Sequence, residues 1–230
     1  MKLVIFTLFD FLSWPITVAL MSLAAVPSAY IAYLFYGNHH PIIVLALIPL
    51  YYFIWLFTFL LLSSLEMSFF GIFFKKPKKL IFLEDLKSTL AAVVFHNMSK
   101  RLRLVFSIPF VETLLVPTYS LPFLHTLPFR AYSLGKVKVG KMSAVYTFPT
   151  DPDLLEVGEN VVIGAKAFLV GHAVKSTNDG KRLYMTDPII IEDNVTVGSC
   201  AFIAMGVKLR KGSLVLANSY VEPYTEIKES

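Results

Sequence analysis

Charge is absent from a long stretch near the N-terminus. No charged residue occurs in residues 11–65, and no Lys or Arg lies between Lys2 and Lys75. The chain of 230 residues is 56% hydrophobic and has a mean hydropathy of +0.65, which is too apolar for a soluble domain of this size. The lack of charge therefore excludes an ordinary water-exposed domain for this part of the chain.

Cysteine and histidine are also scarce. The single cysteine, Cys200, cannot form an internal disulfide, and we expect it to be a small buried residue. Of five histidines only His172 lies in the C-terminal part of the chain. A zinc site of the three-histidine type is therefore excluded, and no bound metal is expected.

The uncharged stretch can accommodate two membrane-spanning helices, because each needs about 20 predominantly apolar residues. We expect them at residues 5–36 and 41–70, joined by a polar turn at residues 37–41. Three prolines within them can produce kinks, which membrane helices tolerate. A cleaved signal peptide is the alternative, but its apolar region would span only about 7–15 residues.

Basic residues predict the topology. Lys2 precedes the first helix, and a basic cluster follows the second: Lys75, Lys76, Lys78 and Lys79. Both ends should therefore lie on the cytoplasmic side, so we expect a multi-pass cell-membrane protein whose C-terminal domain faces the cytoplasm. The net charge of +5 indicates attraction to anionic lipid. No nucleic-acid motif accompanies it, so a nucleic-acid partner is not expected.

A period of six residues runs through the C-terminal part of the chain. The units are VGKMSA, VYTFPT, DPDLLE, VGENVV, IGAKAF and LVGHAV, and after residues 175–190 they resume as IEDNVT, VGSCAF, IAMGVK, LRKGSL, VLANSY and VEPYTE. This period fits neither an amphipathic helix nor an alternating strand, but it suits a three-sided parallel coil with three hexads per turn. The residues expected to fill it are Val157, Ile163, Leu169, Ile191, Val197, Ile203, Leu209 and Val215.

Between these two parts, apolar and charged residues alternate at helical spacing. This spacing predicts an amphipathic helix that lies in the membrane interface. Its apolar residues are Leu83, Leu86, Leu90, Val94 and Met98. Four prolines in residues 104–134 argue against one continuous helix there, although a third spanning helix is an alternative. We therefore expect a transmembrane hairpin (1–79), an interfacial helical region (80–134) and a β-helix domain (135–230).

His172 is the main candidate for chemistry. It lies in the last hexad before the polar interruption KSTNDGKRLYMTD, and long connections within compact folds are often functional. A neutral imidazole can take a proton from an attacking hydroxyl or amine near neutral pH. The alternative is a structural histidine that is hydrogen-bonded at the base of a loop.

The segment from His172 through PIIIEDNVTVGSCAFIAMGVKLRKGSLVLANSYV resembles the hexapeptide-repeat acyltransferases of the left-handed β-helix fold. Those proteins show a histidine, a loop, a run of the form PIxIGDNVxIG and a PGVxIG-like hexad, which correspond to residues 188–198 and 205–209 here. The stretch PTDPDLLEVG (149–158) is similar to the start of the C-terminal membrane modules of polylysine-synthetase-type peptide synthetases. The resemblance covers roughly residues 116–221.

This resemblance implies a set of site residues. It makes His172 the general base and the backbone N–H of Ser199 the oxyanion donor. Ala217 and Asn218 would line the pantetheine groove. Basic residues would meet the phosphates of the donor, or else form a solvated surface: Lys208, Arg210 and Lys211. Polar residues are assigned to the acceptor: Asp151, Asp153 and Asn178. The two aspartates would orient the acceptor or His172, or only form a turn.

The resemblance also implies a homotrimer, with acyl-CoA or an acyl carrier thioester as co-substrate and no bound cofactor. The C-terminal end lacks the basic tail of small acetyltransferases, so a carrier protein is kept as a possible partner. The leading prediction is an acyltransferase that acts on a membrane lipid or lipid-linked acceptor. The alternatives are an aminoacyl-transferring, peptide-bond-forming module and a non-catalytic trimeric scaffold in the membrane.

Overall fold

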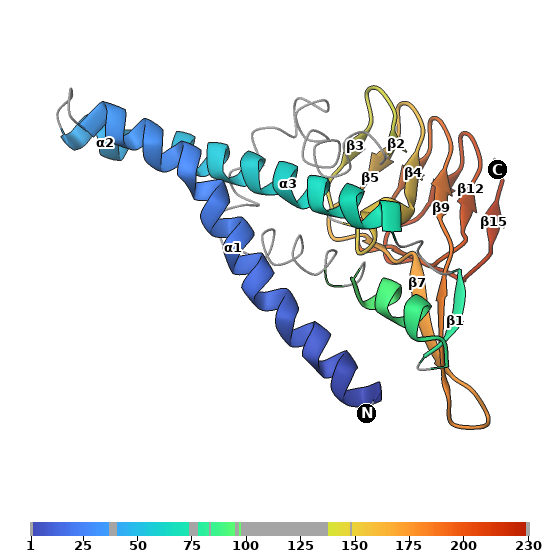
Figure 1. Cartoon of the computed structure of the whole chain (residues 1–230). Helices are drawn as coiled ribbons and strands as arrows, with labels where there is room; N and C mark the ends of the chain where they lie inside the picture. The colour runs from blue at the N-terminus through green and yellow to red at the C-terminus, as the bar shows by residue number, and fades with distance from the viewer. Residues whose placement is uncertain are drawn as a thin grey trace.

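The structure is a computed structural model that describes residues 2–36, 41–73, 78–82, 84–94, 97, 138–147 and 149–228. Helices occupy the N-terminal part and short strands the C-terminal part (Figure 1). Several parts of the predictions lie outside the described residues. They are residues 37–40 of the predicted turn, Lys75 and Lys76 of the basic cluster, and the proline-containing stretch 104–134. Leu83 and Met98 of the predicted amphipathic helix also lie outside them.

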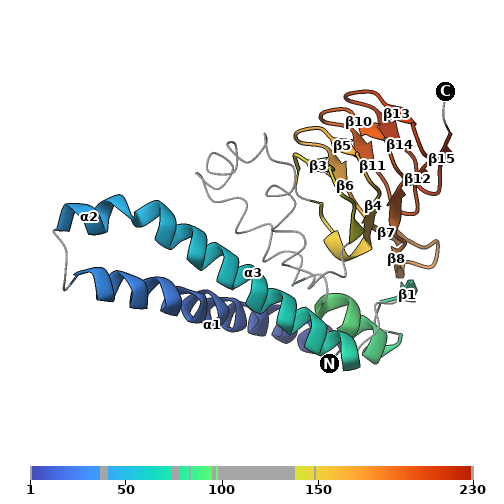
Figure 2. The same ribbon diagram turned by 90° about the horizontal axis from the view of Figure 1, so that it is seen from above.

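The N-terminal part has two long helices and a short one between them. These are α1 (Lys2–Tyr36), α2 (Pro41–Ala46) and α3 (Ile48–Phe73). Only Leu47 separates α2 from α3, two residues before Pro49, which has no N–H to donate. Figure 2 shows α1 and α3 alongside each other, and Figure 1 shows that their axes diverge toward the N-terminus of α1. The indole Nε1–H of Trp55 donates to the Met21 carbonyl across this contact (3.0 Å).

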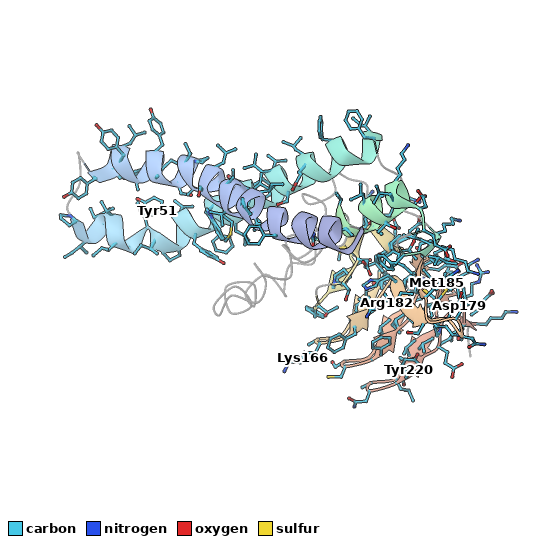
Figure 3. All side chains as sticks on the ribbon, turned by 60° about the horizontal axis from the view of Figure 1, so that its bottom comes forward. Tyr51, Lys166, Asp179, Arg182, Met185 and Tyr220 are labelled. Carbon is cyan, nitrogen blue, oxygen red and sulfur yellow. The ribbon has the colours of Figure 1, made fainter. Side chains whose placement is uncertain are left out.

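Apolar side chains project outward along both helices (Figure 3). Among the described residues, one helical segment, Pro15–Tyr36, is long and apolar enough to cross a membrane by length and composition. Ile48–Ser63 is a shorter apolar segment of the same kind. Of the two predicted spans, the structure therefore supports one, and the second span stays a prediction.

The C-terminal part is a parallel β-helix with three faces. Face I holds β2 (Lys138–Val139), β4 (Leu155–Val157), β9 (Ile189–Ile191), β12 (Lys208–Leu209) and β15 (Glu226–Ile227). Face II holds β3 (Ala144–Val145), β5 (Val162–Ile163), β10 (Thr196–Val197) and β13 (Leu214–Val215). Face III holds β6 (Phe168–Leu169), β11 (Phe202–Ile203) and β14 (Tyr220–Val221). The left-handed winding, which the hexapeptide-repeat resemblance implies, stays a prediction.

The strand register confirms the period of six. Val197 pairs with Val215, eighteen positions later, which is one coil of three hexads. Across the interruption Ile163 pairs with Val197, thirty-four positions later. The second spacing exceeds one coil by sixteen residues, the length of the predicted break at 175–190. The chain therefore leaves the coil there and re-enters it in the same frame.

All eight aliphatic residues predicted to fill the coil are buried in one cluster. Each lies on the inward side of a two- or three-residue strand, next to an outward neighbour. Every coil adds one such residue from each face, so the core grows by stacking. This apolar column fixes the position of each edge residue along the axis of the coil.

Residues with positive φ recur where one face meets the next. The edge between faces II and III has Lys166, Cys200 and Asn218 at φ between 59° and 60°. Side chains at such positions point into solvent, and Cys200 is exposed, so the prediction that it is buried was wrong. Its place in the hexad is the turn and not the strand. Close stacking also needs glycine, since a Cβ on Gly198 would lie 2.3 Å from the Ala217 nitrogen.

The polar interruption forms a β-hairpin and not an irregular loop. Its strands are β7 (His172–Ser176) and β8 (Arg182–Thr186), and β1 (Lys79–Ile81) pairs antiparallel with β8 as a third strand. Figure 1 shows β7 and β1 projecting together from one side of the coil. The segment that follows α3 therefore docks on the hairpin that interrupts the repeat.

A helix at residues 86–94 follows β1. The Asp85 carboxylate caps it by accepting the N–H groups of Lys87 (3.1 Å) and Ser88 (3.3 Å). The predicted apolar face is only partly right. Leu86 is exposed, whereas a face that includes Ala91 and Ala92 is buried, because Ala92 packs with Leu80 and Tyr184. Packing against the hairpin sheet, and not hydrophobic spacing alone, sets which side is covered.

Candidate active site

The imidazole of His172 is held by a buried carboxylate. Nδ1 of His172 lies 2.6 Å from Oδ2 of Asp151, whose side chain is 1% exposed, while that of His172 is 15% exposed. The same Oδ2 accepts the backbone N–H of Gly171 (3.1 Å). A carboxylate only accepts hydrogen bonds, so Nδ1 carries the proton and the lone pair of neutral His172 is on Nε2. This is the tautomer that a general base requires.

The local sequence explains why the two side chains meet. Asp151 begins the turn η2 (Pro152–Leu154), in which the Leu154 N–H donates to the Asp151 carbonyl (3.0 Å). One coil later the chain passes through Gly171, where a Cβ would lie only 2.7 Å from Cβ of Leu154. Glycine thus lets the two segments approach closely. Asp151 both forms the predicted turn and contacts His172.

Tyr184 covers the other side of the imidazole and was not identified from the sequence. Its ring stacks on that of His172, with centroids 5.8 Å apart and planes at 28°. Burial, together with the nearby carboxylates of Asp151 and Asp153, raises the pKa of the Tyr184 phenol above its usual value, so it stays protonated. The signal in the sequence was a lone aromatic residue within the polar stretch KRLYMTD.

A second group of predicted residues lies on the edge between faces II and III. Ser199 follows Gly198 there, and its backbone nitrogen lies over Gly164 of the preceding coil. In the next coil the Asn218 N–H donates to the Ser199 carbonyl (3.0 Å), and Ala217 stacks on Gly198. The structure therefore brings together Ser199, Ala217 and Asn218. Asn218 also forms the turn, since its φ is 60°.

The two groups lie on different edges of one chain. His172 begins β7, which leaves the coil between β6 of face III and β9 of face I. Ser199 lies between β10 of face II and β11 of face III. The whole width of face III separates the two edges, so one copy does not bring the imidazole and the Ser199 N–H together.

The predicted basic residues lie elsewhere again. Lys208 is on face I, and Arg210 and Lys211 are on the edge between faces I and II. Arg210 bridges two carboxylates, with Nη1 2.6 Å from Glu192 and Nε 2.8 Å from Glu226. These hydrogen bonds hold the pKa of both glutamates below the usual range. This pairing favours the charged-surface interpretation of Arg210 over a phosphate contact.

The other two predicted substrate residues, Asp153 and Asn178, lie in different elements. Asp153 lies in η2, near Tyr184. Asn178 is in the turn at the tip of the β7–β8 hairpin, whereas His172 is at its base. Figure 3 labels the neighbouring Asp179, which lies apart from Tyr220 of the coil. In the described part of the chain, no three His, Cys, Asp or Glu side chains are grouped as a metal site would need.

Comparison with known proteins agrees with the repeat. Residues 188–223 match the family model described as the hexapeptide repeat of succinyl-transferase. The C-terminal coil is a hexapeptide-repeat segment. The match confirms the hexapeptide-repeat resemblance and supports the acyltransferase class drawn from it. A search of curated proteins gives no match, and the likeness to polylysine-synthetase modules stays a prediction.

Solved structures that match part of this chain include several acyltransferases. A hexapeptide-repeat-containing acetyltransferase from Vibrio cholerae is 17% identical over 58% of this chain and 81% of its own, with a TM-score of 0.36. An N-acyltransferase from Bacillus cereus, in complex with dTDP and 3-hydroxybutyryl-CoA, is 17% identical over 40% and 76%, with a TM-score of 0.27. A galactoside acetyltransferase in complex with coenzyme A is 16% identical over 50% and 72%, with a TM-score of 0.29.

Proposed function

We propose that this chain is a membrane acyltransferase with His172 as general base. It transfers an acyl group from a cytoplasmic thioester, acyl-CoA or an acyl carrier thioester, to a hydroxyl or amine of a membrane-associated acceptor. The observation that carries the proposal is the 2.6 Å contact between Asp151 Oδ2 and His172 Nδ1 on a hexapeptide-repeat coil. A buried carboxylate on Nδ1 keeps Nε2 as the proton acceptor.

The reaction then follows from the charges. Nε2 of His172 takes the proton as the acceptor oxygen or nitrogen attacks the thioester carbonyl, and Asp151 stabilises the imidazolium that forms. The Ser199 N–H stabilises the negative charge on the carbonyl oxygen. As the tetrahedral intermediate collapses, the C–S bond breaks and the imidazolium returns its proton to the thiolate. The products are the acylated acceptor and a free thiol.

The proposed site requires more than one copy. Because His172 and Ser199 lie on different edges, we assign the base to one copy and the oxyanion donor to its neighbour. Ala217 and Asn218 accompany Ser199 on that second copy. A ring of three copies, in which each edge meets the other edge of the next, gives three equivalent sites.

The proposed membrane placement puts both long helices across the bilayer. Pro15–Tyr36 meets the requirement for a span, and α3 runs beside α1 with many exposed apolar side chains. Exposed Lys78 and Lys79 follow α3, which favours the cytoplasmic side for the coil. An acceptor held in the bilayer would then reach the base without a bimolecular search through solution.

The test compares His172→Ala with the wild-type protein in lipid nanodiscs. A panel of acyl-CoA thioesters is supplied with a total extract of bacterial membrane lipid, and acylated products are followed by mass spectrometry. Removing a general base typically lowers the rate by 10²–10⁴-fold, and we expect a loss of about that size. The matched control is Val174→Ala, two positions further along the same strand and more than half exposed. Equal rates for His172→Ala and wild type would overturn the proposal.

A further inference from the structure

We propose that Tyr184 is a positioning residue for His172, and that residues 78–82 and 84–94, which follow the apolar helix α3, hold Tyr184 in place. This inference rests on the proposed function, because it concerns the same imidazole. It adds that the base is fixed by the segment leaving the helical hairpin as well as by the coil.

The ring contact follows from the register of the hairpin. His172 pairs with Thr186 and Val174 with Tyr184, so His172 and Tyr184 are diagonal neighbours on one face of the β7–β8 ladder. Their rings stack, and Asp151 is hydrogen-bonded to Nδ1 of the same imidazole. The carboxylate limits rotation about one edge of the ring, and the phenol limits tilting out of its plane.

Tyr184 is 3% exposed, although it lies outside the apolar column of the coil. It packs instead in a separate cluster with Leu80, Ala92 and Phe82. The Phe82 ring meets it edge-on at a centroid distance of 5.4 Å. All three neighbours come from the segment after α3, so that segment provides the packing that keeps the Tyr184 ring in place.

Backbone hydrogen bonds fix this segment to the hairpin. Leu80 pairs directly with Tyr184 in the β1–β8 ladder. The Phe82 N–H donates to the Arg182 carbonyl, and the Thr186 N–H donates to the Lys78 carbonyl, both at 2.9 Å. An isolated two-stranded hairpin is marginally stable in water, whereas a third strand with apolar packing stabilises it. β1 therefore stabilises the β7–β8 hairpin, and through it the position of the imidazole.

The experiment compares Tyr184→Ala with Tyr184→Phe in nanodiscs, under the assay above. Tyr184→Phe retains the ring and should retain turnover. Tyr184→Ala should lower kcat between about tenfold and 10²-fold, because small misplacement of a catalytic group is costly, while KM for the thioester changes little. Phe82→Ala should also lower kcat, because Tyr184 loses one of its packing partners. Leu214→Ala removes an exposed apolar side chain from face II and should leave both constants unchanged.

A second readout reports on the imidazole directly. In histidine-labelled protein, the ring resonances of His172 are assigned by their loss in His172→Ala, and stacking on Tyr184 shifts them through the ring current. We expect that shift to disappear in Tyr184→Ala, to persist in Tyr184→Phe and to weaken in Phe82→Ala. Tyr184→Leu, which keeps an apolar side chain at the buried site, serves if Tyr184→Ala does not fold.

The outcomes separate the two proposals. Unchanged resonances and unchanged kcat in Tyr184→Ala or Tyr184→Leu overturn the positioning role, whatever His172→Ala does. An equal loss of kcat in Tyr184→Phe and Tyr184→Ala also overturns it, because the hydroxyl and not the ring would then matter. Activity that survives in His172→Ala overturns the proposed function, while the ring-current shift still shows whether Tyr184 positions the imidazole.

Discussion

Asp151 combines two tasks in a single carboxylate oxygen. Oδ2 accepts both the Gly171 N–H and the Nδ1–H of His172 inside a buried turn. Hydrogen bonds to a charged acceptor are stronger than neutral ones, and a buried group left without its partner is costly. The same oxygen therefore stabilises the fold at this edge and sets the tautomer of the proposed base.

Replacing Asp151 with Asn tests both tasks. The neutral amide keeps the shape of the side chain but loses the charge that stabilises an imidazolium, so kcat should fall by at least about 10²-fold. The free energy of unfolding should fall by about 1–3 kcal/mol, since charge-assisted hydrogen bonds are lost in a buried place. Turnover and urea unfolding measure the two effects.

Asp193→Asn is the control for this change. Asp193 also accepts a backbone N–H at a corner of the coil, from Glu159 (2.7 Å), but on the edge between faces I and II. It should reduce stability slightly and leave kcat unchanged. If Asp151→Asn kept wild-type turnover, the carboxylate would have no part in the chemistry and the assignment of the base would lose its main support.

At the scale of the element, the coil depends on glycine where successive corners stack. A Cβ on Gly198 would lie 2.3 Å from the backbone nitrogen of Ala217. Backbone cannot yield there as a flexible side chain could, so Gly198→Ala should force the two coils apart. Overpacking of this kind costs about 1–3 kcal/mol. Activity should fall with it, because the Ser199 N–H moves with the corner.

Thermal unfolding and turnover of Gly198→Ala check this expectation. Gly180→Asn is the comparison, since Gly180 has φ of 77° at the hairpin tip and nothing lies within 4 Å of where a Cβ would be. Asn tolerates the left-handed region better than other side chains, so this change should have little effect on either measurement. A melting temperature for Gly198→Ala equal to wild type would show that the corners are not as tightly stacked as described.

The sequence predicts regular elements well and their connections poorly, for physical reasons that differ by segment. The hexads predict the strands because each inward aliphatic residue recurs at a fixed spacing, and Ile163, Val197 and Val215 align accordingly. The polar stretch 175–190 gave no sign of a hairpin, because β8 is completed by β1 from about a hundred residues earlier. Cys200 was misplaced because the buried small residue of its hexad is Ala201, one position after the exposed turn residue.

The site divides in the same way. His172 stands out in the sequence because it is the only histidine in the repeat, and Asp151 because it opens a turn motif. Tyr184 does not stand out, since its importance comes from packing with Phe82 and from the ladder that aligns it with His172. Contacts between segments far apart in the chain decide such residues, and periodicity carries no information about them.

At the scale of the whole molecule, the two edges that carry the proposed reaction lie apart on each copy. The edge with His172 and the edge with Ser199 flank face III. On the exposed side of that face Phe168, Phe202 and Tyr220 form a ladder of contacting rings. Activity should therefore depend on how copies associate, and the proposed trimer makes a quantitative prediction.

Two inactive variants should restore activity when they assemble together. His172→Ala removes the base from one edge, and Ala217→Trp places a bulky ring at the exposed position next to the proposed oxyanion donor on the other. In every cyclic trimer that contains both variants, one of the three interfaces joins an intact His172 edge to an intact Ser199 edge. Differently tagged copies, co-expressed and purified through both tags, should thus recover a substantial fraction of wild-type turnover. The same variants mixed after separate assembly should stay inactive.

Co-assembled trimers with no activity would mean that base and oxyanion donor act within one copy, and face III would then have to be crossed by a movement of the β7–β8 hairpin.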